Sequence, residues 1–234
     1  SIASKYNLFV IEDAAQGLMS SYKGQPLGSI GHIGCLSFHE TKNYQCGEGG
    51  AILLNDEYLS QRAEIIREKG TNRSQFIRGM IDKYRWVDVG SSYLPSELNA
   101  AFLYAQLETA HKVNEKRLSL WNEYLKQLFR VSQVDLQIMP NELRHNAHIF
   151  YIKLKDINER QRMIEHLDAY RIQSVFHYIP LHESKKCLKY NHFHGKDKFT
   201  TKESERLLRL PMHYDLKISD VKYICNKVKE FFND

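Results

Sequence analysis

A single lysine between two apolar stretches is the feature that most constrains the fold of this chain. Residues 33–53 run from an apolar segment through a polar turn carrying Lys42, then through a glycine cluster into a second apolar segment. The pattern predicts two buried strands, at 33–38 and 51–54, joined by the lysine turn. Burial deprives an ammonium group of its hydration and favours the neutral amine, so Lys42 is a candidate nucleophile.

A carboxylate follows another apolar run upstream of the lysine. Residues 8–11 are all apolar and lead directly into Glu12 and Asp13, so we expect a buried strand that ends at this pair. Functional groups in open α/β sheets lie beyond the carboxyl ends of strands, which predicts that Asp13 and Lys42 share one crevice. The same position also suits Asp13 as the N-cap of a helix after the strand.

A lysine and a carboxylate at two strand ends are what pyridoxal 5′-phosphate (PLP) needs from a protein. The lysine forms a Schiff base with the cofactor, and the carboxylate pairs with the protonated pyridine nitrogen so that the ring acts as an electron sink. PLP is therefore the expected cofactor.

Several motifs around these residues resemble the DegT-type sugar-nucleotide aminotransferases. They are EDAAQ at 12–16, LSFHETKN at 36–43 and GEGGA at 47–51. Three later stretches resemble the branch of the family that aminates dTDP-4-oxo-6-deoxy-D-glucose to dTDP-4-amino-4,6-dideoxygalactose. These are GTNRSQF at 70–76, DKY at 82–84 and WVDVGSSYLPS at 86–96.

The resemblance implies cofactor-binding roles for five positions. Lys42 is the Schiff-base lysine and the catalytic acid-base group, and Asp13 pairs with the pyridine nitrogen. Gln16 lies beside the ring hydroxyl, and Ser37 contacts the phosphate. Ser92 is implied to reach the phosphate of the neighbouring subunit's cofactor, at a position where much of the family has asparagine.

The resemblance also implies the substrates and the partner. His177, Tyr178 and His182 resemble the family's His-Tyr-x-Pro-Leu-His stretch near the mouth of the active site, which implies contact with a nucleotide-linked sugar, dTDP-4-oxo-6-deoxy-D-glucose. His39, three positions before the lysine, is a candidate to hydrogen-bond either the sugar or the backbone. An amino acid, most often glutamate, is the implied amino donor. Dehydratases of the same superfamily carry histidine at the lysine position, so Lys42 favours transamination. A homodimer is implied, in which residues 70–95 cross toward the partner subunit.

The implied fold class is α/β, and the chain is expected to divide into two domains. Residues 1–108 match the C-terminal part of a fold-type-I PLP-dependent transferase large domain, and residues 109–234 match a linking helix and a small α+β C-terminal domain. The apolar spacing agrees with this order. It predicts helices at 55–69, 96–107, 111–130, 158–170, 203–210 and 219–232, opened in three cases by Ser96, Asn158 and Ser219, and strands at 148–154 and 174–179.

The matched motifs correspond only to the C-terminal part of a family member. We therefore expect an N-terminal part to be missing, including a glycine-rich turn for the cofactor phosphate and an aromatic side chain that stacks on the ring. The competing hypothesis is a truncated, non-catalytic remnant or split-gene fragment that folds or dimerises without turnover. An exposed sheet edge is expected where the absent strands would pair.

Composition argues against several other classes of protein. The net charge of +5 suits an anionic partner, but the basic residues are scattered, whereas a nucleic-acid footprint needs them clustered. A nucleic-acid binder thus stays a weak third option. The apolar runs are shorter than the ~20 residues that span a bilayer, and no signal peptide is recognisable, so a cytoplasmic location is expected.

The cysteines and histidines do not form a metal-binding pattern. The four cysteines contain no C-x-x-C pair, which argues against a zinc ribbon or a thioredoxin-like motif. His182, His192 and His194 lie in one loop, whereas metal ligands need fixed spacing on rigid elements and supporting contacts. No metal site is expected.

Overall fold

The computed structural model describes residues 2–190 and 193–233, which group into two units. The first unit contains residues 1–112 and 141–146, and the second contains residues 113–140 and 147–234. Nothing in the sequence pattern indicated that residues 141–146 join the first unit. The division into domains after residue 108 stays a prediction.

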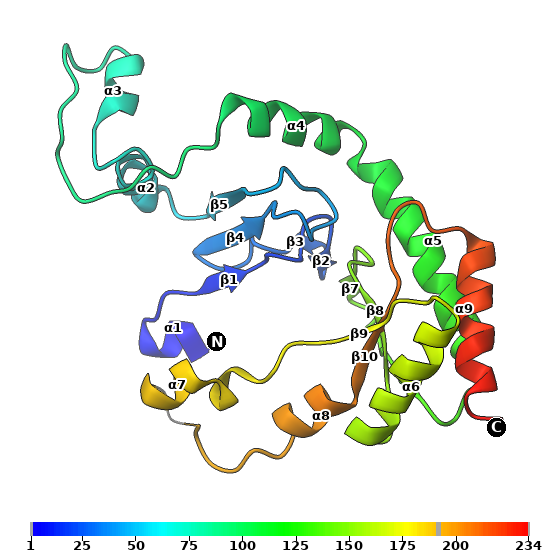
Figure 1. Ribbon diagram of the computed structural model, residues 1–234. Helices are drawn as coiled ribbons and strands as arrows, with labels where there is room; N and C mark the ends of the chain where they lie inside the picture. The colour runs from blue at the N-terminus through cyan, green and yellow to red at the C-terminus, as the bar shows by residue number, and fades with distance from the viewer. Residues whose placement is uncertain (1, 191–192, 234) are drawn as a thin grey trace. The chain divides into compact units, whose positions relative to one another are not determined.

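The first unit is built on a three-stranded sheet in the order β1-β4-β5 (Figure 1). Strand β1 (Ile11–Asp13) runs parallel to β4 (Ile33–Ser37), and β5 (Gly50–Leu54) runs antiparallel to β4. The two strands predicted on either side of the lysine turn are confirmed.

The prediction of a buried strand at residues 8–11 is wrong. A short helix, α1 (Ile2–Tyr6), comes first, the strand begins only at Ile11, and the side chains of Phe9 and Ile11 are 66% and 65% exposed. The reason is that β1 has β4 on one side only, so its other edge has no strand partner among the described residues. The expected exposed edge is present here.

A small second sheet brings residues 141–146 into the first unit. Strands β2 (Ser21–Tyr22) and β3 (Gln25–Pro26) form a hairpin whose two turn residues, Lys23 and Gly24, have φ of +50° and +81°. Positive φ at both turn residues is typical of a type I′ hairpin. Strand β7 (Leu143–Arg144) pairs with β2 on its other side.

The helix predicted at 55–69 is shorter than expected. A 3₁₀ turn, η1 (Glu57–Leu59), is capped by Asp56 and continues into α2 (Ser60–Arg67). The stretch after it holds one short helix, α3 (Arg73–Ile77).

Helix α4 (Glu97–Glu108) begins as predicted, because Ser96 Oγ accepts the Asn99 N–H at 3.2 Å. None of its residues is buried, although many are apolar. Its apolar side chains include Leu98 and Phe102, which are 82% and 51% exposed.

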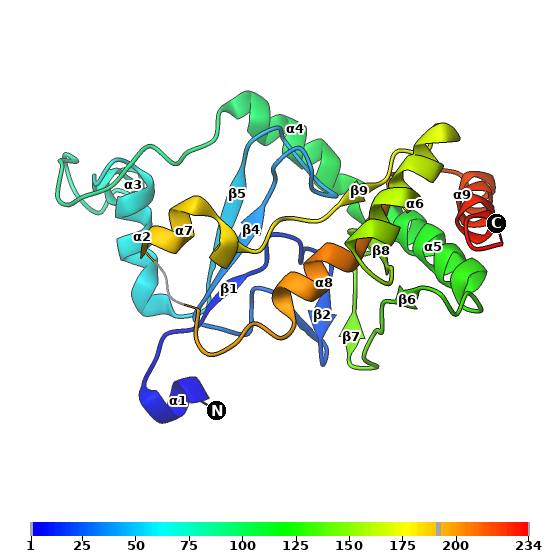
Figure 2. The ribbon, with the colours of Figure 1, turned by 60° about the horizontal axis from the view of Figure 1, so that its bottom comes forward.

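The second unit combines a four-stranded antiparallel sheet with several helices (Figure 2). The strand order is β6-β8-β10-β9. The strands are β6 (Asp135–Leu136), β8 (Phe150–Lys153), β9 (Val175–Phe176) and β10 (Leu207–Leu210). The helices are α5 (Ala110–Leu128), which starts in the first unit, α6 (Ile157–Ala169), η2 (Leu181–Glu183), α7 (Lys185–Tyr190), α8 (Thr200–Arg206) and α9 (Ile218–Glu230).

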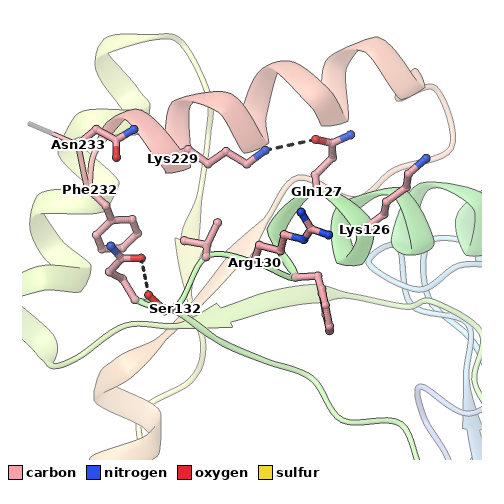
Figure 3. A pocket seen from close by; sticks show the side chains of 10 residues that line it. Lys126, Gln127, Arg130, Ser132, Lys229, Phe232 and Asn233 are labelled. Atoms are coloured by element: carbon pink, nitrogen blue, oxygen red, sulfur yellow. Dashed lines mark hydrogen bonds between the residues drawn. The ribbon is translucent and has the colours of Figure 1, made fainter.

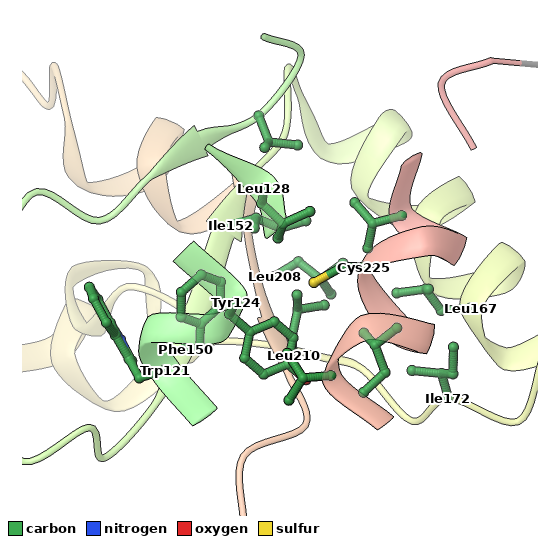
Figure 4. Close-up of a cluster of buried hydrophobic side chains, with 14 of the residues drawn as sticks. Trp121, Tyr124, Leu128, Phe150, Ile152, Leu167, Ile172, Leu208, Leu210 and Cys225 are labelled. Atoms are coloured by element: carbon green, nitrogen blue, oxygen red, sulfur yellow. The ribbon is translucent and has the colours of Figure 1, made fainter. Parts of the chain in front are cut away.

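A single apolar core joins this sheet to α5, α6 and α9 (Figure 4). Alternate residues of the two central strands, Phe150 and Ile152 in β8 and Leu208 in β10, are fully buried. Tyr124 of α5 stacks on Phe150 with ring centroids 4.7 Å apart. The intervening strand residues point to the opposite face and are partly exposed.

The helix predicted at 203–210 is wrong beyond Arg206. Residues Leu207–Leu210 form β10, which pairs with both β8 and β9. The alternation of half-buried and buried residues along this strand has the period of a sheet, but four residues are too few to separate it from a helix by pattern.

Two predicted helix starts are also corrected. Helix α6 is capped by Asp156, whose Oδ1 accepts the Glu159 N–H at 2.9 Å, rather than by Asn158. Helix α9 starts after Lys217, whose N–H donates to Asp220 Oδ2 at 2.9 Å. No helix within the described residues has the length and apolarity needed to cross a membrane.

Candidate functional site

The lysine turn is held in place by its backbone and by two buried rings. The Phe38 N–H donates to Gly49 O at 2.8 Å, and the Lys42 N–H donates to His39 O at 2.9 Å. Phe38 is 6% and Tyr44 is 2% exposed, so both rings anchor the turn. The backbone of Lys42 is therefore fixed by contacts on both sides of it.

Lys42 and Asp13 lie at the same edge of the first sheet. Asp13 ends β1 beside Cys35 of β4, and because the two strands are parallel, their carboxyl ends point the same way. Ser37 ends β4, and the turn with Lys42 follows. Lys42 is half-buried, and its amine makes no hydrogen bond or ion pair with any residue that the structure describes.

Asp13 caps a turn and not a helix. Its Oδ1 accepts the Ala15 N–H at 3.1 Å, and residues 15–16 form a turn. The alternative interpretation of Asp13 as a helix N-cap is therefore wrong. The side chain is exposed, and its second oxygen, Oδ2, has no hydrogen bond within the described ranges, so it is available to a ligand.

Glu12 was not singled out from the sequence, yet it fixes the end of β1. Its carboxylate accepts the backbone N–H groups of Gly28 at 2.9 Å and of Ile30 and Gly31 at 2.6 Å each. Burial alone would raise the pKa of Glu12, but these three donors outweigh it and hold the pKa below its ordinary value. Because side chains alternate along a strand, Glu12 holds one face of β1 while Asp13 points to the other.

Ser37 and His39 lie in the same turn as the lysine. Ser37 Oγ accepts the His39 N–H at 3.3 Å, which leaves its own O–H free to donate. His39 Nδ1 lies 2.9 Å from Thr41 Oγ1, and its Nε2 lies 3.6 Å from Glu48 Oε1. The imidazole is thus held within the turn through Nδ1.

Asn146 connects the segment of Gln16 to the lysine turn. Its Nδ2 donates to the backbone oxygens of Gln16 at 2.7 Å and of Leu18 at 2.8 Å. Its backbone oxygen accepts a hydrogen bond from Asn43 Nδ2 at 3.1 Å. The side chain of Gln16 is exposed. No sequence signal indicated Asn146, because these partners are more than a hundred residues away along the chain.

Ser92 lies elsewhere in the first unit. It is exposed and forms an isolated β-bridge with Glu68 at the end of α2. Within the described part of the chain, no hydrogen bond joins it to the residues of the lysine turn.

Tyr178 and His182 belong to the second unit. Tyr178 is 75% exposed and follows β9. His182 lies in η2, with its Nε2 3.0 Å from Asp197 Oδ2 and 3.4 Å from Thr201 Oγ1. These contacts hold His182 within its own loop.

The residues present fit one side of a PLP site. At one sheet edge stand a half-buried amine and a carboxylate oxygen, neither with a partner among the described residues, together with a hydroxyl, which is the donor set that the cofactor needs. Among the described residues, no group of three histidine, cysteine or acidic side chains is placed to hold a metal ion. His192, one of the three loop histidines considered from the sequence, lies outside the described residues.

The fold and the sequence both match known proteins. The model of the DegT/DnrJ/EryC1/StrS aminotransferase family matches residues 1–229. GDP-perosamine synthase of Escherichia coli O157:H7 is 28% identical over 234 residues, which cover 100% of this chain and 61% of that protein. The chain spans between 60% and 62% of the length of three curated relatives.

Solved structures give the same result. A DegT DnrJ EryC1 StrS aminotransferase from Brucella abortus matches 100% of this chain and 60% of its own, with 27% identity and a TM-score of 0.84. Streptococcus pneumoniae Spr1654 in its PLP form has the same fold, with 22% identity, a TM-score of 0.82 and coverage of 100% and 60%. This chain therefore belongs to the DegT/DnrJ/EryC1/StrS aminotransferase family, and its α/β fold is part of a fold-type-I aminotransferase.

Proposed function

We propose that this chain carries the lysine-bearing part of the active site of a PLP-dependent sugar-nucleotide aminotransferase. The observation that supports it most is the position of Lys42 and Asp13 at the shared carboxyl edge of the parallel strands β1 and β4. The amine and one oxygen of the carboxylate occur together there, and neither has a partner in the part of the chain that the structure describes.

In this proposal, the cofactor would supply an electron sink that stabilises a carbanion next to nitrogen. The Lys42 amine would link to the cofactor and then move a proton, because a half-buried amine without an ion-pair partner can act as a base. Asp13 would accept a hydrogen bond at Oδ2 from the pyridine nitrogen of the cofactor and so keep that nitrogen protonated. Ser37 would donate its O–H to a phosphate oxygen of the cofactor.

The proposed substrate is a nucleotide-linked 4-keto-6-deoxy sugar, dTDP-4-oxo-6-deoxy-D-glucose, with glutamate as the amino donor. The motifs at 70–96 support this choice, and so does the name of GDP-perosamine synthase, which points to nucleotide-linked sugars. His39, Tyr178 and His182 are proposed substrate contacts, and Ser92 is proposed to contact the cofactor phosphate of a second subunit.

The proposed partner is a second copy of the chain. Large apolar side chains are exposed along residues 84–104 of the first unit, and such a run on the surface marks an interface. The exposed set is Tyr84, Trp86, Val87, Val89, Tyr93, Leu94, Leu98, Phe102 and Tyr104. A cytoplasmic location is also proposed, and the four free cysteines agree with a reducing compartment.

The alternative is a remnant that folds without turnover. The observation that favours it is the first sheet, in which the outer edge of β1 has no strand partner among the described residues. Restored transamination on co-expression with the N-terminal part of a relative would argue against a remnant.

The deciding experiment is an absorbance spectrum of the purified chain with added PLP, then borohydride reduction and peptide mass mapping. We expect a visible band and a single reduced linkage on Lys42, both lost in Lys42→Arg. Lys23→Arg is the matched control, because Lys23 is an exposed turn lysine of the same unit and its loss should change nothing. Labelling spread over surface lysines would contradict the proposal.

A further inference from the structure

Cationic side chains gather at two places in the second unit, and the first is explained by the helices themselves. A pocket of about 870 Å³ at the C-terminal ends of α5 and α9 is lined by Lys126, Arg130 and Lys229, among others (Figure 3). Lys229 Nζ donates to Gln127 Oε1 at 3.3 Å. Cations at helix C-termini offset the negative end of the helix dipole, so these charges need no ligand.

The second place is the face of the sheet that points away from the core. Arg209 of β10 pairs with Val175 of β9, and His177 follows two residues after Val175. Side chains two residues apart lie on one face of a strand, so Arg209 and His177 are diagonal neighbours on the same face. The ring of Tyr178 lies beside His177, with centroids 5.0 Å apart.

Both of these basic groups have a buried nitrogen without a partner. His177 Nδ1 and Arg209 Nε are shielded from solvent and have no hydrogen bond within residues 2–190 and 193–233. Burial lowers the pKa of His177, and the positive charge of Arg209 lowers it further. Polar groups left in this state are rare in folded proteins and need a specific explanation.

Two other cations next to this sheet have acidic partners, whereas Arg160, beside the Phe176 ring of β9, donates to the Ser204 carbonyl. Lys153 Nζ lies 2.7 Å from Glu203 Oε2, and Arg206 contacts Asp135 Oδ2 at 2.7 Å and Glu203 Oε1 at 3.1 Å. Arg209 has no carboxylate partner in the described part of the chain. The missing counter-charge is therefore local to the β9–β10 side of the sheet.

We propose that Arg209 and His177 form an anion-binding site that takes the carboxylate or phosphate oxygens of a substrate. A guanidinium group presents parallel N–H donors that match two oxygens of one such anion, and an imidazole N–H adds a third donor. The choice of ligand rests on the proposed function, because its two substrates carry these groups, one as an amino-acid carboxylate and the other as a diphosphate.

The test is isothermal titration calorimetry of the chain without PLP, using glutamate, dTDP and inorganic phosphate as separate probes. We expect glutamate or dTDP to bind, which identifies the source of the anion. Arg209→Gln and His177→Gln should weaken that binding about tenfold or more, because each removes a hydrogen bond to a charged group. Arg130→Gln is the matched control, since it removes an arginine from the α5–α9 pocket, and it should bind like the parent.

Several results would overturn the inference. They are no binding of any probe, parent-like affinity in both the Arg209 and His177 variants, or a loss confined to Arg130→Gln. Binding of phosphate without glutamate or dTDP would reject the assignment to a substrate.

Two further measurements separate binding from folding and from the cofactor. Arg209→Gln removes a buried group without a partner, so its thermal midpoint should equal or exceed that of the parent. Arg209→Lys keeps the charge but not the paired donors and should bind with intermediate affinity, whereas parent-like binding by this variant would contradict the paired geometry. Because no PLP is present, anion binding can succeed or fail independently of the labelling of Lys42.

Discussion

The carboxylate of Glu12, next to the proposed cofactor ligand Asp13, fixes the strand end beside the lysine turn. Glu12 binds three backbone N–H groups of the 28–31 loop, while Asp13 on the opposite face of β1 keeps one oxygen free. The first of these acidic neighbours holds the strand end, and the second is the proposed partner of the cofactor nitrogen.

Replacing Glu12 with glutamine should destabilise the first unit. The amide loses the negative charge that accepts three N–H groups, and its own NH₂ cannot accept them, so we expect a loss of about 1–2 kcal/mol in unfolding free energy. Chemical denaturation followed by circular dichroism measures this. Glu115→Gln is the control, because Glu115 is exposed on α5 and should change stability little. Equal losses in both variants would show that the three bonds contribute nothing.

The Glu12 carboxylate should make the unfolding free energy of the first unit depend on pH. The folded-state pKa of Glu12 lies below its unfolded value, so its contribution is complete above the unfolded pKa, about 4.3. It is lost as the pH falls through the lower folded pKa. The stability difference between the parent and Glu12→Gln should therefore shrink below about pH 4. A difference that stays constant to lower pH would contradict the assignment.

Among the elements, the strands around Lys42 were predictable, whereas β10, one of the two central strands of the second unit, was not. The lysine turn is bounded by five-residue apolar strands, so a local pattern is enough to find them. Strand β10 has only four residues after a helix, and what makes it a strand is pairing with β8 and β9. Such long-range pairing overrides local preference.

The residues of the two proposed sites also differ in how far the sequence could predict them. Asp13, Ser37 and Lys42 come from short segments whose order the sequence displays. Asn146 and Arg209 act through contacts with distant parts of the chain, which no periodicity reveals.

The two faces of β10 should respond differently to truncation. Leu208 is fully buried, so Leu208→Ala should lower the unfolding free energy by about 2–5 kcal/mol through lost burial and a cavity. Leu207→Ala, on the half-exposed face of the same strand, is the matched control and should cost clearly less. Denaturant midpoints compare the two variants, and equal losses would favour the helix that the sequence predicted.

Helix α4 should belong to an interface between subunits. Leu98 is 82% exposed on a helix with no buried residue, so placing a charge there should weaken dimerisation about tenfold or more. Light scattering after gel filtration of Leu98→Glu measures this. Tyr58→Glu is the control, because Tyr58 is 85% exposed but lies outside residues 84–104. A parent that is monomeric, or a dimer unchanged by Leu98→Glu, would remove α4 from the interface.

At the scale of the whole molecule, the buried apolar side chains are unevenly shared between the two units. The main core consists only of residues of the second unit. Within the described part of the first unit, the buried apolar set is Ala14, Phe38, Tyr44, Cys46 and Ala110. The first unit carries the proposed chemistry on a sheet with an open edge, and the chain spans about three fifths of the length of its relatives.

Hydrogen exchange should reflect this imbalance. Amides of β8 and β10 are paired in the centre of a sheet that has one face buried in the core, so opening them requires unfolding of the core, and they should exchange slowest. Amides of β1 and β5, at the edges of the first sheet, should exchange orders of magnitude faster, because few buried contacts oppose local opening. Mass spectrometry of peptides covering residues 11–13, 50–54, 150–153 and 207–210 resolves the two groups. Equal protection in both would mean that the first unit is as stable as the second without any covering partner.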